Sequence, residues 1–289
     1  MKTILIPVDF SEGSLNSCKY AFDFLGKEES IVHLFHIYND QVMIPDSGFI
    51  GTGMETDTFF NSDIILALKE QAEREMDSLK QELNSLIKEK KYKIRLKHTL
   101  LGGDPRWEIT ETIEELQPDL VFMATQGSGK KGFLEGRMAE KIMYRSSVPV
   151  LAVPADFNTF KISNVLYTTS FNPLDTDVLR LLLKILESHD APVQVCHFTR
   201  EKEIENTSLL MKKLENEFEQ SRIEGKINFH LIKTENEKEA INDFTEQYLI
   251  DLVSFLPGKK HLLGNLFSTH KLRKKDLFSL ELPLLAINI

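Results

Sequence analysis

The chain has 289 residues, of which 42% are apolar and 27% charged, and its formal net charge is −9. This apolar fraction is enough for buried cores and excludes a wholly disordered chain, while the excess of acidic residues argues against nucleic acid as a partner. The two cysteines, Cys18 and Cys196, are too far apart in the sequence to suggest a disulfide framework or a zinc cluster. Because no apolar run is long enough for a signal peptide or a membrane span, the sequence predicts a cytoplasmic protein.

Short apolar runs alternate with longer helical patterns along the whole chain. In the first half the predicted strands are 3–8, 31–37, 93–100, 119–124 and 148–153, and the predicted helices are 12–26, 63–89, 105–116 and 136–145. In the second half the predicted strands are 163–168, 192–198, 226–233, 251–255 and 283–288, and the predicted helices are 173–188, 203–222, 236–248 and 267–278. Nearly continuous apolar strands separated by helices predict an α/β fold, with a parallel sheet that is doubly wound and covered on both faces.

The two halves of the chain repeat one pattern. The matching segments are ILIPVDFSEGS (4–14) with VLYTTSFNPLD (165–175), EITETIEELQPDLVFM (108–123) with EAINDFTEQYLIDLVSF (239–255), and SVPVLAVP (147–154) with ELPLLAINI (281–289). The offset falls from 161 at the starts to 132 at the middle segments, so the first copy holds 29 extra residues, which we place largely in 39–62. The repeat predicts two tandem domains, 1–155 and 161–289.

In a doubly wound sheet, ligands bind beyond the carboxyl ends of the strands, where the winding reverses. The first and fourth strands are neighbours at that point, and the loops after them carry Asp9 and a glycine-rich run that includes Gly127 and Gly136. Glycines let backbone amides approach an anion, and a helix N-terminus adds its positive dipole end. Glycine is also the ordinary residue of a tight strand-to-helix turn, so the loop on its own favours an ordinary turn over an anion site.

The segments ILIPVDFSEGS, PDLVFMATQGS and SSVPVLAVP together resemble the universal stress protein family, and the duplication resembles its tandem two-domain members. The resemblance extends over 1–154 and, less fully, over 161–289. It implies two tandem five-stranded parallel sheets of order 3-2-1-4-5, with helices on both faces, that pair through their last strands. In ATP-binding members, an Asp follows strand one and a loop of the form G-x2-G-x9-G-[S/T] follows strand four.

This chain matches that ATP-binding pattern in part. Asp9 stands at the Asp, whereas Ala124 stands where the first glycine belongs. Eight residues separate Gly127 from Gly136, one fewer than in the pattern, and Arg137 replaces the Ser or Thr. Arg137 would either bind phosphate through its charge or lie solvated in the loop. The candidate adenine-nucleotide site in the first domain consists of Asp9, Ala124, Gly127, Gly129, Gly136 and Arg137.

The second domain lacks a legible phosphate site. Ser170 takes the place of Asp9, and the last loop holds only Gly258 and Gly264. We therefore expect no nucleotide there, and expect this domain to pack against the first as an intramolecular pseudo-dimer in which the closing strands pair antiparallel.

Other residues favour ordinary structural roles. Alternation along a strand places His33 and His36 on opposite faces, so no metal site is expected from them. Trp107, in the first turn of a helix, is expected to pack. Residues 41–62 are rich in apolar side chains and would form either a partner surface or a loop tucked against its own domain.

The sequence predicts a universal stress protein with a regulatory or stress-tolerance role, which binds ATP weakly in its first domain and has no enzymatic activity. The alternative is a scaffold that binds no nucleotide and recognises a protein partner. A nucleotide hydrolase is less favoured because neither a general base nor a Walker-type lysine is apparent.

Overall fold

The computed structural model describes residues 1–40, 56–125, 136–257, 277 and 280–289. In the first half the elements are β1 (Lys2–Pro7), α1 (Glu12–Leu25), β2 (Ser30–Tyr38), α2 (Thr56–Lys90), β3 (Ile94–Gly102), α3 (Pro105–Leu116), β4 (Leu120–Ala124), α4 (Gly136–Arg145) and β5 (Val150–Val153). In the second half they are β6 (Val165–Thr168), α5 (Asp175–Ile185), β7 (Val193–Thr199), the 3-10 helix η1 (Glu201–Glu203), α6 (Ile204–Glu217), α7 (Glu219–Ile223), β8 (Ile227–Lys233), α8 (Glu237–Gln247), β9 (Leu252–Phe255) and β10 (Leu284–Ala286).

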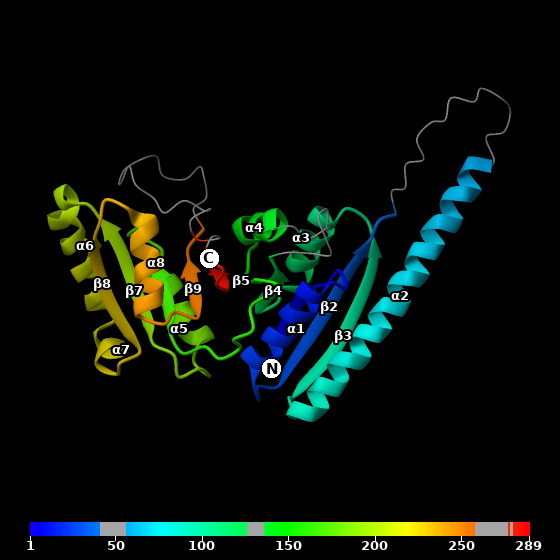
Figure 1. Cartoon of the computed structure of the whole chain (residues 1–289), viewed down its shortest axis with the longest axis horizontal. Coiled ribbons are helices and arrows are strands. Elements are labelled where there is room, and N and C mark those ends of the chain that lie inside the picture. Colours follow the sequence, from blue (N-terminus) through cyan, green and yellow to red (C-terminus); the bar gives the residue numbers. More distant parts are fainter. Residues whose placement is uncertain (41–55, 126–135, 258–276, 278–279) are drawn as a thin grey trace, which may run out of the picture.

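The strands form one ten-stranded sheet of order β3-β2-β1-β4-β5-β10-β9-β6-β7-β8, which crosses the whole molecule (Figure 1). Within each half the strands are parallel and follow the order 3-2-1-4-5, so the predicted fold class is confirmed. The halves meet where β10 runs antiparallel to β5, with Leu285 opposite Leu151. This pairing gives each closing strand a second neighbour, and neither remains an open edge.

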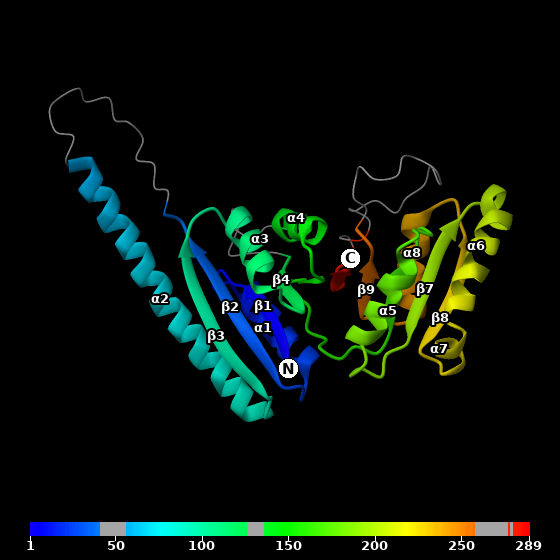
Figure 2. The ribbon, with the colours of Figure 1, turned by 180° about the vertical axis from the view of Figure 1, so that it is seen from behind.

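Helices cover both faces of the sheet, as the two opposite views show (Figures 1 and 2). Helices α1, α2, α5 and α6 pack on one face, and α3, α4 and α8 pack on the other. The central strands are consequently buried on both sides, and all five residues of β4 are buried. This explains why these strands read as continuous apolar runs without polar alternation.

Local capping fixes where several helices begin. Ser11 caps α1 by accepting a hydrogen bond from the backbone N–H of Ser14, and Asp104 caps α3 with Pro105 at the first helical position. Asn236 caps α8 in the same way, through the N–H of Glu239. These side chains satisfy backbone donors that have no partner within the helix.

The structure corrects two of the sequence-based helix predictions. Helix α2 begins at Thr56, not at 63, because no glycine or proline interrupts the chain between Gly53 and Lys90. Residues 56–62 of the expected loop 41–62 are therefore helical, and 41–55 lie outside the described residues. The single helix expected over 203–222 is broken at Phe218, whose side chain is buried in the core. The helix expected at 267–278 also lies outside the description, except for Leu277.

Side chains fix the segment between the halves and the C-terminal end against the first half. The Asn16 side chain donates hydrogen bonds to the carbonyl oxygens of Pro154 and Phe157, at 3.3 and 2.9 Å. Near the other end of the chain, the buried Asn288 amide donates to the carbonyl oxygen of Met143 in α4, at 2.9 Å. Among the described helices, none has an apolar stretch long enough to cross a membrane.

Candidate functional site

Asp9 lies just beyond the carboxyl end of β1, at the start of α1. Its Oδ1 accepts hydrogen bonds from the backbone N–H of Ser11 at 3.1 Å and from the Ser11 hydroxyl at 2.5 Å. Because Ser11 also caps α1, the carboxylate is held at the positive end of that helix. Asp9 is half-buried, so its position is fixed by the turn without being enclosed in the core.

A ring pair supports this turn from the neighbouring strand. Phe10 has a backbone φ of 61°, and its ring lies 4.2 Å from the ring of His36 in β2. His36 Nδ1 lies 2.7 Å from the carbonyl oxygen of Val8. Because a carbonyl oxygen can only accept, Nδ1 carries the hydrogen. Burial lowers the pKa of His36, so the ring is neutral at pH 7 and Nε2 keeps its lone pair.

Strand β4 brings the second part of the predicted site to the same edge of the sheet. Ile4 pairs with Leu120 and Leu5 with Val121, so β1 and β4 run side by side and their carboxyl ends meet. Ala124 is the last residue of β4 and is fully buried. The chain re-enters the described structure at Gly136, where α4 begins. The structure thus brings Asp9 and Ala124 to one edge.

The remaining residues of the predicted site lie wholly or partly beyond what the structure describes. Gly127 and Gly129 fall in 126–135, outside the described residues. Gly136 and Arg137 form the first turn of α4, and only their backbone is described. The proposed contact of the Arg137 side chain with phosphate therefore stays a prediction.

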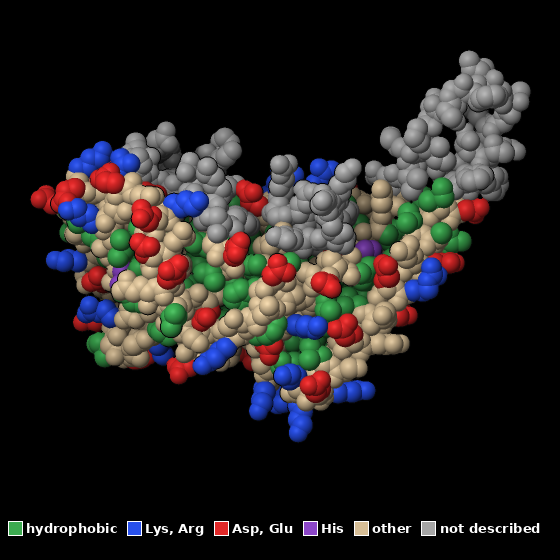
Figure 3. Space-filling view, viewed as in Figure 1, with side chains coloured by type: hydrophobic (Ala, Val, Ile, Leu, Met, Phe, Trp, Pro, Cys, Tyr) green, Lys and Arg blue, Asp and Glu red, His purple; other side chains and the backbone are tan. Residues whose placement is uncertain are grey.

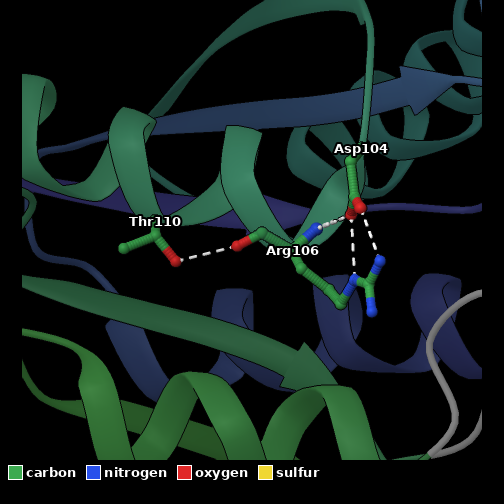
Figure 4. Close-up of polar contacts among 3 residues, drawn as sticks. All are labelled: Asp104, Arg106 and Thr110. Atoms are coloured by element: carbon green, nitrogen blue, oxygen red, sulfur yellow. Dashed lines mark hydrogen bonds and ion pairs between the residues drawn. The ribbon is translucent and has the colours of Figure 1, made fainter.

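Sequence reasoning missed a charged pair at the start of α3 (Figure 4). The Arg106 guanidinium contacts both carboxylate oxygens of Asp104, with Nε 3.1 Å from Oδ1 and Nη2 2.6 Å from Oδ2. Thr110 donates to the carbonyl oxygen of Arg106, one turn further along the helix. The hydrogen bonds from Arg106 lower the pKa of Asp104, and the charge of Lys141 in α4 lowers it further. The sequence predicts the Asp-Pro cap, but it gives no signal for the ion pair between Asp104 and Arg106.

Trp107, which follows this pair, was expected to pack. Its side chain is instead 68% exposed, so the packing interpretation is wrong. The physical reason is its place on the helix. The residues of α3 that face the core are Pro105, Ile109 and Ile113, and position 107 falls between them on the solvent side.

The second half repeats the ring pair without the carboxylate. Phe171 has a φ of 56° and lies 4.3 Å from His197, whose Nδ1 is 2.8 Å from the carbonyl oxygen of Thr169. At the offset of 161 these residues correspond to Phe10, His36 and Val8. Ser170 follows Thr169, at the place of Asp9 in the first half.

The nearest carboxylate of the second half points inward. Asp175 is only 2% exposed, and it accepts hydrogen bonds from the Tyr167 hydroxyl at 2.6 Å, the Thr169 hydroxyl at 2.5 Å and the Asn172 backbone N–H at 2.9 Å. Burial raises the pKa of Asp175, and the hydrogen bonds only partly oppose that effect. This carboxylate serves the core of the second half and does not take the place of Asp9.

The described residues on the visible face of the molecule form no patch of one charge sign (Figure 3). Basic and acidic groups are interspersed over the face of the molecule that Figure 3 shows. His33 contacts Thr99 through Nε2 at 2.8 Å, away from the partners of His36. Within the described ranges, His, Cys, Asp and Glu form no group of three or more that could hold a metal ion.

Comparisons with known proteins agree on one family. The family model described as "Universal stress protein family" matches residues 1–154. The universal stress protein MJ0531 of Methanocaldococcus jannaschii is 27% identical over 153 residues, which cover 53% of this chain and 81% of that protein.

Two solved structures resemble the chain over its whole length. One is a universal stress protein from Archaeoglobus fulgidus, with a TM-score of 0.63 and 17% identity over 99% of this chain and 98% of that one. The other is a functionally unknown protein, PA1789, from Pseudomonas aeruginosa, with a TM-score of 0.56 and 11% identity over 100% and 92% of the two chains. At these identities the structural likeness shows the fold alone.

Proposed function

The chain belongs to the universal stress protein family, and on that premise we propose a function for it. We propose that it is a cytoplasmic regulatory protein without catalytic activity. We further propose that it binds an adenine nucleotide weakly, and in its first half only. The observation that carries this proposal is the position of Asp9. It lies at the carboxyl end of β1 beside β4, where a doubly wound sheet places its ligands, and Ser11 holds it there.

The residues fit the nucleoside part of such a ligand. A carboxylate accepts hydrogen bonds from ribose hydroxyls, and charge-assisted bonds of this kind are stronger than neutral ones. The phosphates would lie toward the loop that contains Gly127 and the first turn of α4, where backbone amides and the helix dipole favour an anion. Arg137 would add positive charge there in place of the family's hydroxyl.

The test is a calorimetric titration of ATP and adenosine into the full chain. Asp9→Asn keeps an oxygen that can accept from Ser11, so the turn should survive, but it places an amide donor where ribose needs an acceptor. Loss of a hydrogen bond to a charged group costs about 1.5–3 kcal/mol, so affinity should fall about tenfold or more. The matched control is Ser170→Ala, at the equivalent position of the second half, which should change nothing.

Arg137→Ser separates the two interpretations of the phosphate side. If Arg137 binds phosphate by charge, the variant should weaken ATP more than adenosine and reduce the salt dependence of ATP binding. If Arg137 obstructs the site, the same change should tighten ATP. Mass spectrometry of the denatured, freshly purified protein would identify any nucleotide that co-purifies.

The competing proposal is a scaffold that binds a protein partner through residues 41–62 and needs no nucleotide. One described feature favours a contact near this segment, because Leu66 in the N-terminal part of α2 is 54% exposed. No measurable binding of ATP or adenosine to wild type and to both variants would discard the nucleotide proposal and leave the scaffold.

A further inference from the structure

The ten-stranded sheet ends in two edge strands of different chemistry, β3 and β8. The exposed residues of β3 include Arg95 and Lys97, and charged residues on an edge strand discourage pairing with another chain. Strand β8 has the sequence INFHLIK and holds no Lys, Arg, Asp or Glu before Lys233. It lies at the outer end of the second half, beside α6 and α7 (Figures 1 and 2).

The backbone of β8 presents unused hydrogen-bonding groups on its outer side. Val193, the first residue of β7, donates to the carbonyl oxygen of Lys226, and Thr234 donates to the carbonyl oxygen of Thr199, the last residue of β7, both at 2.9 Å. Even-numbered residues of β8 therefore direct their backbone groups at β7. Successive residues alternate, so Ile227, Phe229 and Leu231 direct theirs outward, where none of the described strands pairs with them.

The outer side of β8 is accessible. A groove of about 430 Å³ lies over Phe229 and His230 at the first part of the strand. Arg222 of α7 borders it on one side and Tyr248, at the end of α8, on the other. Five of the seven residues of β8 are half-buried and Lys233 is exposed, so part of the strand remains accessible to solvent.

We propose that β8 is a dimer interface, in which two copies of this chain pair their β8 strands antiparallel about a twofold axis. Identical strands paired in this way match outward donors with outward acceptors on both sides. If the axis passes at His230, Phe229 lies opposite Leu231, and Ile227 lies opposite Lys233. No charged residue then faces one of like sign.

The chain already contains one joint of this kind. Strands β5 and β10 pair antiparallel through uncharged residues, with Leu284 opposite Ala152 and Ala286 opposite Val150. The proposed dimer would extend the same sheet beyond β8, whereas the β3 edge, which carries Arg95 and Lys97, would stay open. This favours a second copy over an unrelated extended peptide, because the second copy supplies a strand that is already ordered and whose only charged residue is Lys233.

The test is sedimentation velocity of the full chain across the micromolar range, where weak dimers dissociate. Wild type should change from monomer to dimer with concentration. Leu231→Lys places a charge on the edge strand at a side chain outside both core clusters, and should abolish the dimer. The matched control is Leu101→Lys on β3, where the side chain is 37% exposed, and it should dimerise like wild type.

A second variant and a local readout keep the result interpretable. If Leu231→Lys does not fold, Asn228→Lys places a charge in the groove at a half-exposed position of the same strand. Hydrogen exchange at the amides of Phe229 and Leu231 should slow in the dimer. If wild type is a monomer at every concentration, the proposal is wrong, and an extended peptide becomes the candidate partner for β8. A dimer that persists in both β8 variants, or is lost in Leu101→Lys alone, also overturns it.

Discussion

The buried Asp175 offers a quantitative test of the second half. Replacing it with alanine removes the acceptor for the Tyr167 hydroxyl, the Thr169 hydroxyl and the Asn172 N–H. Tyr167 is fully buried and Thr169 is 6% exposed, so neither hydroxyl can turn to water. Each buried group left without a partner costs about 1–3 kcal/mol, so Asp175→Ala should lose about 2–6 kcal/mol of unfolding free energy.

Asp175→Asn separates the charge from the hydrogen bonds. Burial raises the folded-state pKa of Asp175 above the unfolded value of about 3.9, so the folded protein binds this proton more tightly than the unfolded chain. The stability that the carboxyl contributes is therefore complete below the unfolded pKa and is lost as the pH rises through the folded pKa. The Asn variant has no such proton, so its stability relative to wild type should improve as the pH rises.

Urea unfolding followed by circular dichroism, at a series of pH values, measures both effects. The other titrating groups are shared by the two proteins and cancel in the difference between them. A loss below about 1 kcal/mol in Asp175→Ala would show that the three donors find other partners. A difference between wild type and Asp175→Asn that is constant with pH, or changes in the opposite sense, would refute the assignment of a raised pKa.

Three further outcomes are expected. Leu285→Ala should lose about 2–5 kcal/mol of unfolding free energy in urea, because Leu285 is fully buried where the two halves join, and a cost near zero would contradict that burial. Both cysteines should resist a thiol reagent until the protein unfolds, since burial raises the pKa of Cys18 to about 12 and raises that of Cys196 as well; rapid reaction of the native protein would contradict this. His36→Ala should lower both the melting temperature and the affinity for ATP, because His36 supports the turn that carries Asp9, whereas His197→Ala, in the half without that carboxylate, should lower only the melting temperature; equal effects of the two variants on ATP would show that this turn does not position Asp9 for ATP.

The sequence predicts most of the sheet because its strands are buried on both faces. A strand such as β4, with five buried residues, leaves an unbroken apolar run that is easily recognised. The adjacency of Asp9 and the end of β4 also follows from topology alone, since neighbouring parallel strands end at the same edge. The pairing of the closing strands was implied by the family resemblance and not by the repeat itself, and β5 and β10 do run antiparallel.

Features set by distant contacts were harder to predict. The break at Phe218 depends on that side chain being buried in the core, and the exposure of Trp107 depends on which side of α3 faces the sheet. The contact of Phe10 with His36 joins the turn after β1 to β2, and no pattern within either segment predicts it. The repeat did contain a signal, because a Phe and a His recur in the second half at the same offset of 161.

Comparing equivalent residues of the two halves distinguishes contacts that maintain the fold from residues that a ligand would require. Asp119 accepts from the N–H of Thr3 at 2.7 Å, and its counterpart Asp251 accepts from that of Asn164 at 3.1 Å, so this contact serves the sheet in both halves. The Phe–His pair also occurs in both halves and supports the turn after the first strand. A contact that occurs in both halves is therefore explained by the fold and is not by itself evidence for a ligand site.

The carboxylates near that turn differ between the halves, and the difference follows from the core. In the second half, Tyr167 and Thr169 put two hydroxyls into the interior, and Asp175 is required there as their acceptor. The first half has Ile6 and Val8 at the corresponding positions, which need no acceptor. In the first half, Asp9 accepts hydrogen bonds from Ser11 at the carboxyl end of β1. A half-buried carboxylate held where a doubly wound sheet binds its ligands, with Ser170 at the corresponding position of the second half, is the argument for our proposal that a nucleotide binds in the first half only.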